Sequence, residues 1–157
     1  MSGSSGQVVL KLAYPIVVES VSIDHVSGDI IPEGKRNTAP KHVKIIGYPP
    51  CDKADEKCKT VGFDMDDPTE IADIHYDLEG RSVQTFESHY AKAMANLPES
   101  SFDKEEAEPG SCSVKTSCSA PPRISVAAVV INVLENGGNS DFTCLYRLRL
   151  HGDPDES

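Results

Sequence analysis

Five cysteines are the residues in this sequence whose spacing points most directly to chemistry. Cys51 and Cys58 form one close pair and Cys112 and Cys118 a second, each inside a polar loop, while Cys144 stands apart. Cysteine pairs in exposed loops of a small domain are typical of disulfides formed in an oxidising compartment. Free thiols and zinc are the alternatives, but neither pair has C-x2-C spacing and no histidine lies three to five residues away. We therefore expect two loop disulfides.

Other reactive groups do not assemble into a recognisable catalytic or metal motif. The sequence has no Gly-x-Ser-x-Gly elbow and no phosphate loop. Cys144 with His25 or His151 could form a thiol–imidazole pair, but a half-buried cysteine in a strand is more often core or disulfide. The acidic run at 64–67 suggests a calcium loop, yet Thr69 stands where an EF-hand needs glycine. We expect no enzyme, no metal and no other cofactor.

Length and charge restrict the class of protein. The chain has 157 residues, enough for one domain, with 38% hydrophobic residues and no tryptophan. Its net charge of −10 argues against non-specific binding to nucleic acid or to an anionic membrane. No run of 18 apolar residues is present, so membrane attachment would need a segment outside these residues.

Hydrophobic patterning predicts strands and almost no helix. The final run alternates strictly, with Phe142, Cys144 and Tyr146 on one face of a strand predicted from 141 to 152. A slip in the alternation at Glu19 predicts a bulge, and Pro15 is expected to end the first strand. The predicted strands cover 7–12, 16–26, 43–48, 74–77 and 83–87 as a hairpin, 124–134 buried on both faces, and 141–152. The pattern predicts an all-β fold, an antiparallel β-sandwich.

Two polar stretches interrupt this pattern. Residues 51–60 form a charged loop insertion, and residues 88–122 form a longer acidic insertion, in which 89–97 could make one or two helical turns. Residues 1–6 are either a flexible terminus or the remnant of an expression tag, and 153–157 form a tail. The domain itself is expected to span 7–152.

Several motifs in this order resemble the SUN (Sad1/UNC-84) domain family. The closing Phe-Thr-Cys-Leu-Tyr-Arg-Leu-Arg-Leu-His-Gly resembles the signature that ends these domains. Earlier matches agree in order: Val21-Ser-Ile-Asp-His-Val, Thr38-Ala-Pro-Lys, Val43-Lys-Ile-Ile-Gly-Tyr, Tyr76-Asp-Leu-Glu-Gly and Val83-Gln-Thr-Phe. The resemblance implies a jelly-roll-like sandwich akin to galactose-binding folds.

The resemblance also implies a function. SUN domains are non-catalytic, lie in the perinuclear space of the nuclear envelope, and bind the C-terminal tails of KASH proteins, which links the nucleoskeleton to the cytoskeleton in the LINC complex. Complete members carry a transmembrane helix, a coiled coil, a lid hairpin and a first strand before this part, and they act as homotrimers. We therefore expect this chain alone to be monomeric and to bind a KASH peptide weakly. The family partner of Cys144 would lie in the missing part, so Cys144 is expected to be unpaired.

The residues that match the family's peptide groove are His25, Thr38, Phe142, Cys144 and Tyr146. Thr38 stands where serine is common and keeps the hydroxyl. Phe142 stands where tyrosine is common and loses one, which predicts weaker capture of a terminal carboxylate. A purely structural role is the alternative, in which His25 caps a strand and the two aromatic residues pack in the core.

Two other functions remain open on the same fold. One is a carbohydrate- or glycan-binding module, although such modules usually place aromatic platforms on their loops and tryptophan is absent here. The other is an ER-resident SUN-like protein of the ER lumen that aids membrane-protein folding. The closing signature favours the nuclear-envelope branch.

Overall fold

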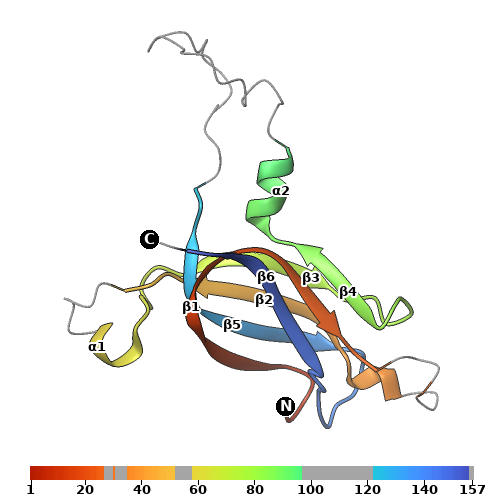
Figure 1. Cartoon of the computed structure of the whole chain (residues 1–157). Coiled ribbons are helices and arrows are strands. Elements are labelled where there is room, and N and C mark those ends of the chain that lie inside the picture. The colour runs from red at the N-terminus through yellow and green to blue at the C-terminus, as the bar shows by residue number, and fades with distance from the viewer. Residues whose placement is uncertain (27–29, 31–34, 52–57, 97–121, 156–157) are drawn as a thin grey trace, which may run out of the picture.

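The computed structural model describes residues 1–26, 30, 35–51, 58–96 and 122–155 (Figure 1). No helix in these ranges is long and apolar enough to cross a bilayer. The elements in chain order are β1 (Gly6–Asp24), the 3-10 helix η1 (Lys35–Thr38), β2 (Pro40–Tyr48), α1 (Cys58–Val61), β3 (Thr69–His75), β4 (Val83–Glu87), α2 (His89–Ala95), β5 (Ser125–Asn136) and β6 (Arg147–Pro154).

The strands form an antiparallel sheet in the order β3-β2-β5-β1-β4, with β6 also paired to β1. Strand β5 lies between β2 and β1 and is buried along most of its length. Its apolar run from Val126 to Val133 suits this place, because a strand covered on both faces needs no polar side. One face contributes to the main core, and the other packs through Ala128 against Phe63.

The sheet folds into two layers, and β1 is long enough to belong to both: its first half lies in one layer with β5, β2 and β3, and its second half lies between β4 and β6. Its first half pairs with β5, whereas its second half pairs with β4 on one edge and β6 on the other. The change of partner follows a register shift between Lys11 and Ile16, which contains Pro15, a residue without an N–H to donate. The bend is visible in Figure 1, where β1 turns back over the sheet.

The hydrophobic core lies between the two halves of this bent strand. Val21 and Ile23 from the second half of β1 are fully buried together with side chains of β2, β3 and β5. The buried members of this cluster are Val18, Val21, Ile23, Ala39, Val43, Ile45, Ile71, Ala72, Ile74, Tyr76, Val126, Val129, Ile131 and Val133. Burial of these aliphatic groups holds the layers together.

A bulge sets how β6 meets β1. Val18 lies opposite Gly152 and Ser20 opposite His151, so Glu19 has no partner on β6. At this point the backbones are very close, since a Cβ added to Gly152 would lie 1.9 Å from the carbonyl oxygen of Val17. Only glycine fits there, which explains why the final His-Gly motif has a glycine at position 152.

The structure confirms the all-β antiparallel class, the bulge at Glu19, the short helix after Ser88 and the doubly buried strand β5. The jelly-roll detail stays a prediction. Three expectations are wrong. Pro15 lies within β1 and does not end it. Strands β3 and β4 pair with different strands rather than with each other. The final strand begins only at Arg147. The residues before it, 142–146, lie outside the strands.

We predict that Gly152→Ala lowers the free energy of unfolding by about 2 kcal/mol or more, because the new methyl group meets backbone that cannot move without breaking the β1–β6 pairing. Urea denaturation followed by circular dichroism measures the change. Gly6→Ala is the matched control, since its Cβ would meet chiefly the flexible side chain of Met1. Similar small losses in both variants would contradict the close-approach explanation.

Candidate functional site

The segment between β5 and β6 is held by the side chain of Asn136, which is buried at the end of β5. Its Oδ1 accepts hydrogen bonds from the N–H groups of Gly138 and Asn139, at 2.9 and 3.0 Å. Its Nδ2 donates to Thr143 Oγ1 at 2.9 Å. One amide therefore fixes both the turn and the segment after it, which lies outside the six named strands.

The first residues of the chain lie against the same segment. The N–H of Thr143 donates to the carbonyl of Met1 at 2.9 Å, and Thr143 Oγ1 donates to the carbonyl of Gly3 at 2.8 Å. The N–H of Gly3 donates to Asp141 at 2.8 Å. Ser2 and Phe142 form an isolated bridge in the same short ladder, which we call the terminal clasp (residues 1–3 with 141–143). Thr143 is buried as a result.

The turn that contains Thr38 lies directly beside this segment. The N–H of Cys144 donates to the carbonyl of Thr38 at 2.7 Å. The turn at residues 36–38 can lie this close to the end of β5 because Gly137, which follows β5, has no side chain. A Cβ at position 137 would lie 2.8 Å from Asn37 Cα and 2.9 Å from the carbonyl oxygen of Arg36. Thr38 is buried, and Cys144 is a half-buried free thiol.

His25 follows β1 and brings a buried imidazole to the same place. Its side chain is only 7% exposed, and its ring centroid lies 6.4 Å from that of Tyr146 in an edge-on arrangement. Its backbone N–H donates to the carbonyl of Ser82, whereas among the described residues its ring nitrogens have no well-formed hydrogen bond and only a weaker contact with the backbone of Val26. A buried polar group without a partner is costly and calls for an explanation.

The two aromatic residues of the candidate site face solvent rather than the core. Tyr146 is 70% exposed and Phe142 is 47% exposed. The core-packing alternative for these two side chains is therefore wrong. The alternation in this region misleads because Thr143 turns inward to meet Asn136, so the buried and exposed sides are exchanged relative to the predicted strand.

The structure thus brings the five predicted residues into one region, through one ring contact and one backbone hydrogen bond. The donors that this region offers to an acceptor group, such as a carboxylate, are the imidazole of His25 and the exposed hydroxyl of Tyr146. Arginines lie close by, since Arg149 and Arg147 pair with Asp24 of β1 at 2.9 and 3.8 Å.

The cysteines divide between described and undescribed residues. Cys51 and Cys58 form a disulfide with a Cα–Cα distance of 5.6 Å, which confirms this predicted pair. Cys112 and Cys118 lie outside the described residues, so their pairing stays a prediction.

Sequence reasoning missed two groups of polar side chains. Ser22 Oγ lies 2.8 Å from His151 Nε2 and 2.8 Å from Thr85 Oγ1, and so links β1 to both of its neighbours. Ser22 is buried, which leaves its hydroxyl no room to attack a substrate. The second group, around Asp73, was missed because it joins β2 to β3. Its only local signal is the alternation of Asp73 and His75 on one strand face.

These features define an antiparallel β-sandwich with a hydrogen-bonded segment leading into its last strand. A family model described as "Sad1 / UNC-like C-terminal" matches residues 1–97 and 89–154. The chain therefore belongs to the SUN (Sad1/UNC) domain family, as its motifs predict.

Relatives agree with this membership. The nuclear migration and anchoring protein unc-84 of Caenorhabditis elegans is 30% identical over 149 residues, which cover 95% of this chain and 10% of the relative. Human SUN domain-containing protein 3 is 26% identical over 97% of this chain and 31% of its own length. SUN domain-containing protein 2 of Arabidopsis thaliana is 27% identical over 97% of this chain and 25% of its own. The chain spans less than a third of the length of each of these relatives.

Burial of His25 predicts a pH-dependent stability. Burial lowers the pKa of His25 below its ordinary value of 6.5, so the unfolded chain takes up a proton more readily than the folded one. His25 therefore contributes stability that is present above pH 6.5 and is lost as pH falls through the folded pKa. Thermal denaturation between pH 7.5 and 5 should show a smaller loss of stability in His25→Gln than in the unchanged protein. Equal slopes in the two proteins would show that His25 does not titrate with folding.

Proposed function

We propose that this chain is a non-catalytic SUN domain that binds the C-terminal tail of a KASH-domain protein in the perinuclear space, and so links nucleoskeleton to cytoskeleton across the nuclear envelope. The observation that supports this most is the buried imidazole of His25, which has no well-formed hydrogen bond among the described residues and lies beside the exposed ring of Tyr146. Family membership supports the class of partner.

A peptide's terminal carboxylate would supply what His25 lacks. An unpartnered buried donor or acceptor costs roughly 1–3 kcal/mol. Both ring nitrogens are enclosed, so the exposed Tyr146 ring would have to move aside to admit a carboxylate. A carboxylate that then accepted a hydrogen bond from the imidazole N–H would recover that free energy, and the bond would be strengthened by the negative charge. The phenol of Tyr146 extends into solvent and can supply a second donor at the same place.

The neighbouring segment presents exposed side chains that an extended tail could contact. Residues 143–146 lie outside the strands, and Phe142 and Tyr146 present apolar surface to solvent. Exposed aromatic side chains flanking polar donors are suited to hold a peptide whose end is charged. Three arginines lie around this region: Arg36, Arg147 and Arg149. Their positive charge favours an anionic ligand here, although the chain as a whole is strongly acidic.

The proposed location rests on separate observations. The disulfide between Cys51 and Cys58 fits an oxidising lumen. The C. elegans relative is a nuclear migration and anchoring protein by name. We extend to this chain the family's homotrimeric assembly, in which each peptide would also contact a neighbouring copy.

Binding should depend on the free end of the peptide. In calorimetry with KASH-type tail peptides, we expect the free-acid peptide to bind at least tenfold more tightly than its C-terminally amidated form, because amidation removes the charge that the donors hold. The chain is best tested both alone and fused at its N-terminus to a trimeric coiled coil. Equal affinity for both peptides would remove the carboxylate-capture mechanism.

Restoring the family's hydroxyl should strengthen binding. We predict that Phe142→Tyr raises the affinity for the free-acid peptide roughly tenfold to a hundredfold, because a hydrogen bond to a charged group contributes about 1.5–3 kcal/mol. Tyr146→Phe should weaken the affinity by removing a donor. Tyr14→Phe is the matched control, since Tyr14 is an exposed tyrosine on β1 outside the candidate site. A similar change in the control would assign the effect to general surface chemistry.

A further inference from the structure

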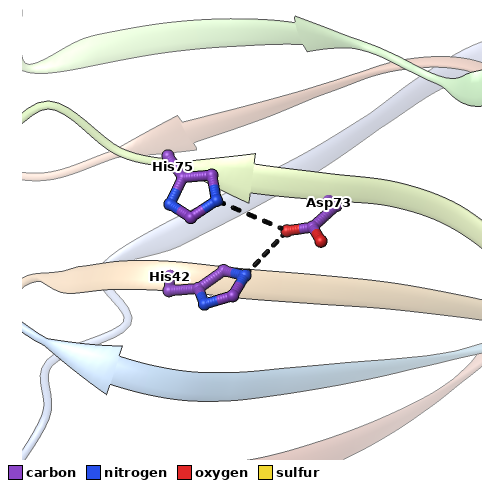
Figure 2. A group of neighbouring side chains, drawn as sticks. All are labelled: His42, Asp73 and His75. Carbon is purple, nitrogen blue, oxygen red and sulfur yellow. Dashed lines mark hydrogen bonds and ion pairs between the residues drawn. The ribbon is translucent and has the colours of Figure 1, made fainter.

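Three side chains that can bind a metal ion gather on one face of the sheet, where β2 and β3 pair (Figure 2). They are His42 on β2 and Asp73 and His75 on β3. None of them belongs to the five residues of the candidate peptide site. Both imidazoles point toward the same carboxylate oxygen, Asp73 Oδ1, as Figure 2 shows.

The strand register explains why the three side chains meet. His42 and His75 are direct partners across the antiparallel ladder, and Asp73 lies two residues before His75, so it shares the same face. The imidazole rings stack with centroids 4.2 Å apart and planes inclined by 20°. The arrangement is thus set by the backbone of two paired strands, which are more rigid supports than loops.

The spacing of the donor atoms suits a small divalent ion. His42 Nε2 lies 2.7 Å and His75 Nε2 lies 3.9 Å from Asp73 Oδ1, and the donor atoms all lie within 4.8 Å of one another. A tetrahedral zinc ion with bonds of 2.0–2.2 Å holds its ligand atoms about 3.3 Å apart. Small side-chain rotations therefore suffice to bring the three atoms to bonding positions. His75 is free to make the larger movement, since its side chain is 72% exposed.

Neighbouring charges orient the carboxylate without occupying the shared oxygen. Lys44 Nζ lies 3.3 Å from Asp73 Oδ2, the other oxygen, and 3.0 Å from Glu70 Oε2. Such contacts to the outer oxygen of a ligand commonly fix its orientation. On the other side of β2, Glu135 of β5 lies opposite His42 and pairs with Lys41 at 2.9 Å. The two lysines and the two glutamates balance, which leaves Asp73 as the local excess negative charge.

We propose that His42, Asp73 and His75 form a zinc-binding site on the outer face of β2 and β3. Two imidazoles and one carboxylate are ligands that zinc prefers, whereas calcium requires six to eight oxygen ligands. Three protein ligands leave a fourth position for water or for a group from another molecule. When zinc binds, the hydrogen bond between His42 and Asp73 is replaced by a bond from each of these two residues to the ion, and His75 supplies the third bond. An imidazole that carries protons on both nitrogens must release one of them to bind the ion.

The site can be tested with ZnCl2 on the full chain, purified without a histidine tag and freed of metal by a chelator. We expect calorimetry to show one zinc ion bound per chain, a raised melting temperature with zinc, and no heat from CaCl2. His42→Ala, His75→Ala and Asp73→Asn should each weaken zinc binding at least tenfold. His89→Ala is the matched control, since His89 is a half-exposed histidine near Glu70 but not a member of the three. It should bind zinc as the unchanged protein does.

A second measurement separates loss of the site from loss of the fold. Melting temperatures without zinc should stay close to that of the unchanged protein, because the three side chains are outside the hydrophobic core. In NMR spectra, the imidazole signals of His42 and His75 should shift with zinc, while those of His25 and His89 should not. Zinc binding that persists in His42→Ala and His75→Ala would assign the ion to other groups, such as free thiols. Absence of binding by the unchanged protein would show that the cluster serves only as ion pairs. Either result would overturn the proposal.

Discussion

The fold depends on β1 pairing with different strands along its length. If β1 ended at Pro15, β4 and β6 would have no strand to join, and the core residues Val21 and Ile23 would lose their cover. Proline is tolerated there because the ladder is already interrupted, so its missing N–H costs no hydrogen bond. The bulge at Glu19 and the glycine at position 152 then let β6 approach β1 closely. These local exceptions to regular pairing make the two-layered arrangement possible.

Much of the fold could be predicted from local pattern, because burial imposes periodicity on sequence. The run from Val126 to Val133 is apolar on both parities, and the structure buries both of its faces. Which strands pair with each other was harder to predict from the sequence. The segments that became β3 and β4 have the short glycine-containing connection of a hairpin, yet β3 pairs with the preceding strand β2 and β4 pairs with the distant strand β1. The strict alternation predicted for residues 142–146 also failed, because a hydrogen bond from Asn136 turns Thr143 inward and only the short terminal clasp pairs with this segment.

The two candidate sites differ in how far the sequence could reveal them. The meeting of His25 with Tyr146 follows from the resemblance to a family, since no spacing rule connects residues so far apart. His42, Asp73 and His75 carry no short motif that joins all three, and their meeting depends on the register of β2 with β3. A one-residue change of that register would send His42 to the opposite face of the sheet from the other two. Chemistry built across strands is therefore visible only once pairing is known.

The terminal clasp has a mechanical consequence. Three residues at one end of the chain are held beside the segment that carries Phe142, while Asp155 at the other end donates a hydrogen bond to Pro15 at the bend of β1. Tension applied through residue 1 would therefore load the few hydrogen bonds of the clasp before it reached the core. Those bonds would separate one after another, as in peeling, rather than sharing the load as a long ladder pulled along its strands does. The conformation of residues 141–143 would thus respond to pulling at the N-terminal end.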